Sequence, residues 1–567
     1  MTHHARVLCL LAGLGLASIS VPTTAQPAFQ VKDINTSASG GIQVLGDDAV
    51  TVAGIAFFAA SDGVVGAELW RSDGTAAGTR RVKDVCPGSC PSNPLFLTAL
   101  GTELYFSADD GAHGRELWKS DGTEAGTVLV KDVTPGLGSS GPGVLTAVNG
   151  RIFFFANDGV HGQEPWVSDG TDVGTTLLAD VLPGALGSSP WPLATVGSTL
   201  FFSADDGIHG GELWKTDGTP LGTAMVKDIN PGSGSSLSSG SPFFFPKAAA
   251  LGGQLLFAAD DGTHGIELWT SDGTAMGTGL LADLVPGSGG ANPFDFVVAG
   301  TLVFFQANDP VHGLELWASD GTPGGSGRVK DINPGTASSV PWELTAVGSQ
   351  VFFTASDGAH GRELWKSDGT DAGTVMVKDV NPGAGDSAYI FTPMRLTASG
   401  SRLFLFANDG VNGPEPWVSD GTDAGTTLLA DLNPGPQGSF LGQGFGISRS
   451  TVAGGRWFFT AYTPATASEI YVSDGTPAGT TLVADVDHQA SAFGLSFFSG
   501  SLIEPGALAD LSGTLFFQAT DGISGQELWK SNGTPGGTVQ VADLVPGAVG
   551  SSPVELTAVG GALFFAA

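Results

Sequence analysis

Short apolar runs separated by glycine-rich turns recur along almost the whole chain. In one stretch the runs lie at residues 343–347, 350–355, 362–366 and 374–380. They are followed by Gly348 and by the polar segments 357–361, 367–370 and 381–383. Runs of this length that are bounded by Gly, Asp and Pro are typical of β-strands. The pattern therefore predicts four consecutive antiparallel strands.

Both faces of these strands are expected to be covered. Val351, Phe352 and Phe353 are apolar at consecutive positions, which does not fit a strand with one solvated face. A single four-stranded sheet cannot bury both of its faces, so neighbouring copies must stack. Four antiparallel strands in 40 to 50 residues is also the unit size of a β-propeller blade. No segment after the first 25 residues has a convincing helical period.

The unit repeats about ten times. A Glu-Leu-Trp or Glu-Pro-Trp signature places Trp at 70, 118, 166, 214, 269, 317, 365, 417 and 529, and Tyr471 takes its place in one copy. The predicted fold class is all-β, with tandem four-stranded antiparallel blades forming one large or two smaller β-propellers. An open β-solenoid is the alternative.

The two ends of the chain complete the pattern in part. Residues 31–34 resemble an isolated fourth strand, and residues 556–566 resemble an isolated first and second strand. Together they would form an eleventh blade that lacks only its third strand. A truncated C-terminus would explain the missing strand.

The first 25 residues have the layout of a secretory signal peptide. A basic start with Arg6 is followed by an apolar run at residues 7–19 and by small residues that end at Ala25. We expect cleavage before Gln26, which leaves residues 26–567 as the repeat region. A membrane anchor is the alternative, but the run is short for a bilayer span. The mature chain is therefore expected to be secreted or cell-surface, without a membrane span.

Composition narrows the choice of partners. The net charge of −33 excludes nucleic acid as the default partner. Cys86 and Cys90 are the cysteines of the mature region, and in an oxidising compartment they are expected to form a local disulfide. A metal site is the alternative for this pair, but further ligands are not close in sequence.

The repeated signature resembles a known family. The sequence Glu-Leu-Trp-Lys-Ser-Asp-Gly-Thr at 116–123 and 363–370 is similar to the ELWxxDGT repeat family of secreted bacterial proteins, some of which are named hyalin repeat proteins. The resemblance covers almost the whole mature chain. It implies an exported or cell-surface protein and implies no defined reaction. Tyr471 and Asn532 depart from the motif.

Residues that recur in every copy are expected to be structural. A catalytic carboxylate is needed once, whereas the signature Glu occurs ten times, so we expect it to accept hydrogen bonds from turn N–H groups. The Asp of Val-Lys-Asp invites the same interpretation, and the recurring Trp is expected in the core. We therefore predict no enzymatic activity. The structural set is represented by Glu116, Trp118, Asp121, Glu363, Trp365 and Asp368.

The Asp-Gly turns raise the question of metal binding. Six of them carry a histidine, at 113, 161, 209, 264, 312 and 360, and Asn412 and Ser524 fill the same place in two others. We expect these residues to form hydrogen bonds within the turns. Calcium is the alternative, because hard cations take clustered oxygens. The densest candidates are Asp109, Asp110, Asp205 and Asp206, with Glu116 and Glu212 six residues further on. No other cofactor is expected.

Trp191 and Trp342 lie outside the repeat signature. Both stand beside Pro in segments expected to be loops, which makes them candidates for ligand contact. The sequence favours a secreted scaffold for adhesion or protein interaction, with an extracellular protein or a glycan as partner. A lectin-like glycan-binding propeller is the alternative, and a propeller glycosidase or lyase is favoured less.

Overall fold

The computed structural model of the chain describes most of the repeat region. The described residues are 6–11, 29–33, 50–61, 65–73, 78–237, 248–388, 394–440, 450–463, 467–483, 508–521, 523–544, 547, 550–559 and 561–566. They form two compact units. The central unit comprises Thr98–Ser120 and Val128–Ser387, and the terminal unit comprises Met1–Leu97, Asp121–Thr127 and Ala388–Ala567.

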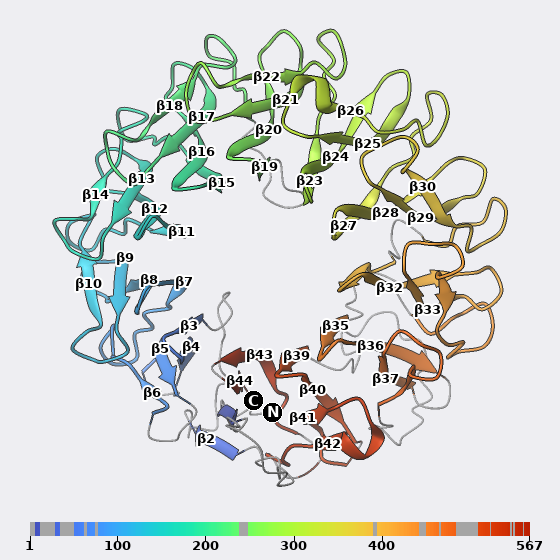
Figure 1. Cartoon of the computed structure of the whole chain (residues 1–567). Coiled ribbons are helices and arrows are strands. Elements are labelled where there is room, and N and C mark those ends of the chain that lie inside the picture. The colour runs from blue at the N-terminus through green and yellow to red at the C-terminus, as the bar shows by residue number, and fades with distance from the viewer. Residues whose placement is uncertain are drawn as a thin grey trace, which may run out of the picture. The chain divides into compact units, whose positions relative to one another are not determined.

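Four-stranded antiparallel sheets make up nearly all of the described chain, which confirms the predicted all-β class with tandem blades. Apart from the sheet that joins the two ends, each sheet takes its strands in chain order (Figure 1). From β7 onward to β30 the strands are β7 (Leu95–Leu100), β8 (Glu103–Asp109), β9 (Arg115–Ser120), β10 (Val128–Lys131), β11 (Gly143–Val148), β12 (Arg151–Asn157), β13 (Gln163–Ser168), β14 (Thr176–Leu177), β15 (Trp191–Val196), β16 (Thr199–Asp205), β17 (Gly211–Thr216), β18 (Ala224–Lys227), β19 (Ala248–Leu251), β20 (Gln254–Asp260), β21 (Ile266–Ser271), β22 (Gly279–Ala282), β23 (Phe294–Ala299), β24 (Leu302–Asp309), β25 (Gly313–Ser319), β26 (Ser326–Arg328), β27 (Trp342–Val347), β28 (Gln350–Ser356), β29 (Arg362–Ser367) and β30 (Val375–Lys378).

The terminal unit has the same kind of sheet. Its strands are β1 (Arg6–Leu11), β2 (Phe29–Asp33), β3 (Val50–Val52), β4 (Ile55–Ser61), β5 (Ala67–Ser72), β6 (Arg80–Arg81), β31 (Thr397–Ser399), β32 (Arg402–Asn408), β33 (Pro414–Ser419), β34 (Thr427–Leu428), β35 (Ser450–Ala453), β36 (Arg456–Thr463), β37 (Ala467–Ser473), β38 (Thr481–Leu482), β39 (Leu508–Leu511), β40 (Thr514–Thr520), β41 (Gln526–Ser531), β42 (Val539–Gln540), β43 (Val554–Val559) and β44 (Ala562–Ala566). Two short 3₁₀ turns, η1 (Pro323–Gly325) and η2 (Pro535–Gly537), stand between a third and a fourth strand. In the described part of the chain no helix is long and apolar enough to cross a membrane.

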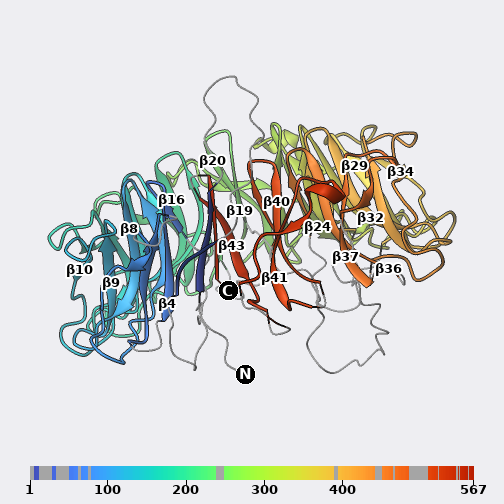
Figure 2. The same ribbon diagram turned by 90° about the horizontal axis from the view of Figure 1, so that it is seen from below.

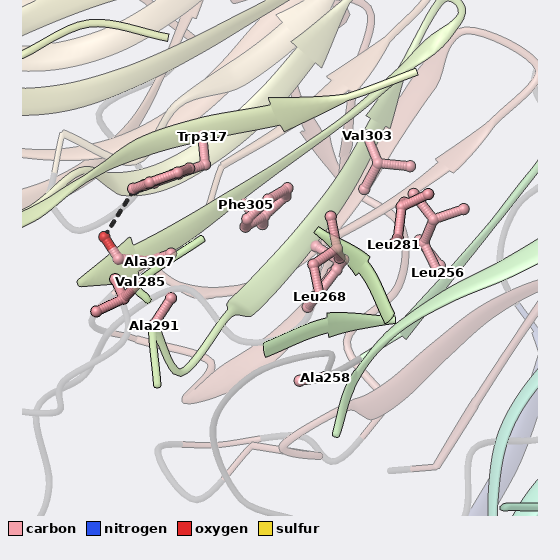
Figure 3. Close-up of a cluster of buried hydrophobic side chains, with 12 residues drawn as sticks. Leu256, Ala258, Leu268, Leu281, Val285, Ala291, Val303, Phe305, Ala307 and Trp317 are labelled. Carbon is pink, nitrogen blue, oxygen red and sulfur yellow. Dashed lines mark hydrogen bonds between the residues drawn. The ribbon is translucent and has the colours of Figure 1, made fainter. Parts of the chain in front are cut away.

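The core lies between successive sheets, because the second strand of each sheet is buried on both faces. Val351, Phe352 and Phe353 of β28 are at most 3% exposed. In the cluster of Figure 3, Leu256 and Leu268 of one sheet pack with Phe305 and Trp317 of the next. The expected stacking of copies through both faces is therefore confirmed within the central unit.

The signature Trp is a core residue, as predicted. Trp118 and Trp365 are buried, while Trp214 is half-buried. Each faces a Phe of the second strand, as Trp365 faces Phe353 in the register of β28 and β29. In the sheet of Figure 3 the indole Nε1 of Trp317 also donates to the carbonyl of Ala307 at 3.0 Å. Burial of an aromatic surface at one place in each sheet explains why the residue recurs.

The two ends of the chain share one sheet, in the order β2-β1-β44-β43. Most of the two predicted end segments thus lie in one sheet, but β2 and β44 do not pair with each other. The missing third strand is supplied by β1, which pairs with both β2 and β44. Strand β1 lies within the predicted signal peptide. The other residues of that peptide, 1–5 and 12–25, lie outside the described residues.

Candidate functional site at the loop edge

The antiparallel order brings two kinds of loop to one end of the strands. The turn between the second and third strands lies at this end, and so does the loop from the fourth strand to the next sheet (Figure 2). We call this end, within the central unit, the loop edge. It comprises the turns 110–114, 158–162, 206–210, 261–265, 309–313 and 357–361 and the loops 132–142, 179–190, 228–237, 283–293 and 329–341.

A buried glutamate holds each of these loops. Glu212 is fully buried, and its carboxyl group accepts from the N–H groups of Ile229 at 2.9 Å, Asn230 at 3.3 Å and Ser236 at 3.0 Å. The Ser236 hydroxyl lies 2.5 Å from the same carboxyl group. Glu116 makes the equivalent contacts with Val133, Thr134 and Ser140. Glu116 and Glu212 thus accept hydrogen bonds from backbone N–H groups, as the sequence predicts for the signature Glu.

Burial also changes the ionisation of these carboxyl groups. Removal from water raises the pKa of Glu116 and Glu212, and the hydrogen bonds to the loop oppose this only in part. The same balance raises the pKa of Glu267, Glu315 and Glu415 to about 7 and that of Glu363 to about 8. Burial therefore shifts the ionisation of these anchoring glutamates toward the neutral form.

The anchored loops connect one sheet to the next. Ser188 donates its N–H to the carbonyl of Gln163 in its own sheet at 3.0 Å. The carbonyl of Ser188 in turn accepts from the N–H of Asp205 in the following sheet, also at 3.0 Å. Ser140 connects its sheet to Asn157 in the same way, at 2.8 Å. Anchoring a loop by its glutamate therefore also fixes the spacing of two sheets.

The Asp of Val-Lys-Asp supports these loops as well, as expected. Asp132 accepts from the N–H of Gly136 at 3.3 Å, and Asp331 and Asp379 accept from Gly335 and Gly383 at 3.4 Å. These bonds are longer than those of the buried glutamates, and the side chains of Asp132 and Asp331 are half-buried. These bonds use Oδ2, and the Oδ1 atoms of Asp132 and Asp379 are buried without a hydrogen-bond partner.

The histidines of the Asp-Gly turns are hydrogen-bonded within their turns, as predicted. Asp110 accepts from the N–H groups of Ala112 and His113 with one oxygen, and its other oxygen lies 2.7 Å from Nδ1 of His113. This bond raises the pKa of the His113 imidazole. Burial opposes ionisation of Asp110, but the bonds from His113 and the turn outweigh it and lower the pKa of the carboxyl group. Asn412 and Ser524 take the same place with Asp409 and Asp521.

The four aspartates that are the calcium candidates form hydrogen bonds within their turns. Asp109 and Asp205 accept from the N–H groups of Gly111 and Gly207, and Asp206 pairs with His209 just as Asp110 pairs with His113. Glu116 and Glu212, six residues further on, bind the buried loops instead. Throughout the described ranges no group of three or more His, Cys, Asp or Glu side chains is placed to hold a metal ion.

The opposite end of the strands carries the Ser-Asp-Gly-Thr turns. Asp121 accepts from the N–H of Thr123 at 2.8 Å and from its hydroxyl at 2.7 Å. Asp368 makes the same two bonds with Thr370, and Ser367 lies 2.7 Å from the Thr374 hydroxyl. Gly369 has φ +90°, a backbone conformation that favours glycine. Asp121 and Asp368 therefore form hydrogen bonds within their own turns.

Cys86 and Cys90 form the expected disulfide, with their Cα atoms 5.3 Å apart. The bridge lies in the loop that follows β6. Glu68 anchors the same loop through the N–H groups of Val85 and Ser92.

The loop edge carries exposed apolar side chains that the sequence analysis did not predict. Leu137 is 81% exposed, Val160 64%, Leu186 89% and Ile208 67%. They lie on consecutive loops that the bonds of Ser140 and Ser188 hold together. The sequence signal was available, since Val160 and Ile208 stand between Asp-Gly and His-Gly, in a slot that is also apolar at Val311, Val411 and Ile523.

Trp191 and Trp342 are the first residues of β15 and β27, so the expectation that they lie in loops is wrong. The flanking Pro residues end the preceding loops without preventing pairing, because Trp191 faces Ser203 and Trp342 faces Thr354. Trp191 is 46% exposed beside the loop edge, while Trp342 is half-buried. Of these two residues, only Trp191 therefore has an exposed side chain that a ligand could contact.

Comparisons with known proteins do not assign a family. No protein-family model matches the chain, and no curated protein matches it. The computationally designed Ika8 protein is 14% identical, with 67% of this chain and 96% of that one covered and a TM-score of 0.28. A prolyl endopeptidase is 9% identical over 66% of this chain, with a TM-score of 0.29, and puromycin hydrolase is 14% identical over 74%, with a TM-score of 0.27. The chain spans 53% and 58% of those two structures, and similarity at this level assigns no activity.

Proposed function

We propose that the protein is an exported or cell-surface scaffold that binds other proteins through its loop edge. The observation that carries the proposal is the row of exposed apolar side chains formed by Leu137, Val160, Leu186 and Ile208. Single exposed apolar residues are common, whereas a surface on which they recur from loop to loop is a candidate for protein binding. Leu137 and Leu186 lie on loops that buried glutamates hold in place, and Val160 and Ile208 lie in turns that Asp158 and Asp206 hold, so all four are presented by a preorganised frame.

The chemistry of the same edge favours binding over catalysis. Its carboxyl and imidazole groups form hydrogen bonds inside turns and loops, as His113 does with Asp110 and Glu212 does with Ser236. The contacts also recur from copy to copy, whereas an active site needs unlike residues at one place. The predicted signal peptide and the resemblance to secreted ELWxxDGT repeat proteins support the extracellular setting of the proposal.

The test compares two surface variants of the full chain. In the first, Leu137, Val160, Leu186 and Ile208 are replaced by Ser. In the second, the control, Val173, Leu221 and Met276 are replaced by Ser, because these side chains are as exposed but lie in the turns at the opposite strand ends.

Binding to a panel of immobilised extracellular proteins is measured by surface plasmon resonance. We expect the loop-edge variant to lose at least tenfold in affinity for a bound protein, with the control variant and the melting temperature unchanged. Equal loss in both variants, or binding that survives the loop-edge substitutions, would contradict the proposal.

Glycan binding is the second candidate, and the exposure of Trp191 favours it. An open indole can stack on a sugar ring, and Trp191 stands beside the loop edge. The test is a glycan array with the wild-type protein and a Trp191→Ala variant, each with and without Ca²⁺. Retention of a glycan by the wild type and its loss in the variant would favour this function over protein binding.

A further inference from the structure

Within each sheet of the central unit the Asp-Gly turn packs directly on the loop that leads to the next sheet. A Cβ atom on Gly162 would lie only 2.2 Å from the backbone nitrogen of Gly187. A Cβ atom on Gly114 would also lie 2.2 Å from the carbonyl oxygen of Gly138. Distances this short require glycine, and they show that each turn and its loop form one continuous surface.

The same surface continues from one sheet to the next. The hydroxyl of Thr134, on the loop of one sheet, donates to the carbonyl of Asn157, which precedes the turn of the following sheet. A Cβ atom on Gly207 would lie 2.4 Å from Cδ1 of Leu182, which belongs to the preceding loop. The apolar row of the proposed function therefore stands on backbone segments that touch one another.

The charges on this surface have one sign. In the sheets β7–β10, β11–β14 and β15–β18, each Asp-Gly turn and each following loop carries one aspartate and no Lys or Arg. These aspartates are Asp110, Asp132, Asp158, Asp180, Asp206 and Asp228. Burial opposes ionisation of the three in the turns, but the bonds from the turn and its histidine outweigh it and lower their pKa. Ionised carboxylates are therefore interspersed with the side chains of the apolar row.

The opposite strand ends of the central unit carry exposed apolar side chains too, but their charges are mixed. Nζ of Lys131 lies 3.3 Å from the carboxylate of Asp172, and Nζ of Lys330 lies 3.2 Å from that of Asp371. Lysine ammonium groups of this chain therefore already pair with carboxylates at that end. The turns and loops under the apolar row supply carboxylates without a Lys or Arg of their own.

We propose that the partner of the apolar row is a basic polypeptide segment in which Lys or Arg residues are interspersed with apolar residues. The apolar side chains of the partner pack against the row, and its cations face the aspartates of the same turns and loops. Such charge complementarity selects the partner and orients it, because an acidic segment is repelled by the same carboxylates. The inference rests on the proposed function, since it names the chemistry of the protein that the loop edge binds.

The probe is a labelled synthetic peptide in which the triplet Lys-Lys-Leu is repeated. Two peptides of the same length are the controls, one with Ser in place of every Leu and one with Glu in place of every Lys. Binding to the full chain is measured by fluorescence anisotropy at low and at physiological ionic strength. We expect the Lys-Lys-Leu peptide to bind at least tenfold more tightly than either control, and its affinity to fall as salt is added.

Two triple variants with the same change in net charge locate the binding. The first removes the charge of the turns at the loop edge and combines Asp110→Asn, Asp158→Asn and Asp206→Asn. The second, the control, makes the same change at the opposite strand ends and combines Asp169→Asn, Asp217→Asn and Asp272→Asn. The control turns should keep their fold, because Asn532 accepts the equivalent bonds from the N–H and hydroxyl of Thr534.

A third variant removes charge from the loops and leaves the turns intact. It combines Asp132→Asn, Asp180→Asn and Asp228→Asn. The melting temperature of each variant shows whether it is folded, so the loop variant replaces a turn variant that fails to fold. Where neither folds, the comparison of the three peptides on the wild type and on the loop-edge Ser variant decides the outcome.

We expect the folded loop-edge Asn variants and the loop-edge Ser variant to lose at least fivefold in affinity for the Lys-Lys-Leu peptide, while the control variant binds it as the wild type does. Equal binding of the Ser-containing or Glu-containing peptide, equal loss in the control variant, or unchanged binding by the loop-edge variants would each overturn the inference. Loss of protein partners by the loop-edge Ser variant without any preference for the basic peptide would reject this inference and leave the proposed function standing. Retention of those partners by the Ser variant would instead reject the proposed function.

Discussion

At the scale of single residues, the buried glutamates combine anchoring with an unusual ionisation. The carboxyl group of Glu363 accepts from the N–H of Val380 at 2.9 Å and of Asn381 at 3.3 Å. The Ser387 hydroxyl, which also contacts this carboxyl group, donates to the carbonyl of Arg362 at 2.9 Å. Because its own proton is given to Arg362, the Ser387 hydroxyl oxygen is free to accept a hydrogen bond from the protonated carboxyl group of Glu363, whose pKa burial raises to about 8.

The first prediction compares the loss of the hydrogen-bonding group of Glu363 with the loss of its ionisable proton alone. Glu363→Ala should lower the free energy of unfolding by about 1–3 kcal/mol, because two buried N–H groups lose their acceptor. Glu363→Gln should be milder at pH 7, because the amide reproduces both the acceptor and the donor of the neutral acid. Urea denaturation at pH 7 measures both changes, and a Gln variant as unstable as the Ala variant would contradict the neutral form.

The raised pKa of Glu363 predicts that the stability of the protein falls as the pH rises. A carboxyl group whose folded-state pKa is raised from 4.5 to about 8 contributes stability that is full below pH 4.5 and is lost as the pH rises through about 8. The wild-type melting temperature should therefore fall more steeply between pH 5 and pH 8 than that of Glu363→Gln. Parallel melting curves for the two proteins across this range would exclude the shift.

The third prediction concerns the buried indole. Trp365→Ala should cost about 3–5 kcal/mol, because it leaves a large cavity between two sheets. Trp191→Ala is the matched control, since that side chain is 46% exposed whereas Trp365 is 6% exposed. The control should stay within about 0.5 kcal/mol of the wild type by chemical denaturation. Similar losses in both variants would show that Trp365 is not a core residue.

His113 and His360 should titrate above the ordinary range of a histidine. Their bonds to Asp raise the pKa of His113 and His360, so this contribution to stability is full below pH 6.5 and is lost as the pH rises through the raised folded-state value. NMR titration of the imidazole resonances checks the direction. Asp357→Asn should return the pKa of His360 toward 6.5, with His113 as the internal control.

At the scale of the element, the loop that follows β6 is held twice, by Glu68 and by the Cys86–Cys90 disulfide. A disulfide that closes so short a loop constrains the unfolded chain only modestly. Reduction should therefore lower the free energy of unfolding by about 2 kcal/mol. A Cys86→Ser, Cys90→Ser double variant without reductant is the control and should show the same loss. A loss above about 5 kcal/mol would mean that the bridge fixes more than its own loop.

At the scale of the whole molecule, a net charge of −33 makes the folded chain repel itself at low ionic strength. The carboxylates of the Asp-Gly turns are already hydrogen-bonded, so we expect divalent cations to act by diffuse screening. Ca²⁺ and Mg²⁺ at matched ionic strength should raise the melting temperature by similar amounts, and Na⁺ should raise it less. A rise confined to Ca²⁺ that Asp110→Asn reduces would instead reveal a specific site.

The sequence alone determined the repeating unit of this protein and the role of its recurring residues. The all-β class, the four strands of each copy and the burial of Trp118 and Trp365 follow from apolar spacing and turn residues, which act over a few neighbouring positions. The acceptor role of Glu116 also followed, because a carboxylate repeated ten times cannot be catalytic. These features depend on residues that are close in the sequence, or they recur in so many copies that the pattern itself reveals their role.

The tertiary structure decided what depends on contacts between distant segments. Asp109 and Asp110 lie next to each other in the sequence, but only the fold shows that Glu116 turns to a loop some twenty residues away. The row of Leu137, Val160, Leu186 and Ile208 exists because loop carbonyls pair with the next sheet. Likewise, register with Phe565 placed Leu8 in a third-strand position. Such results arise from packing between sheets, which periodicity within one strand does not encode.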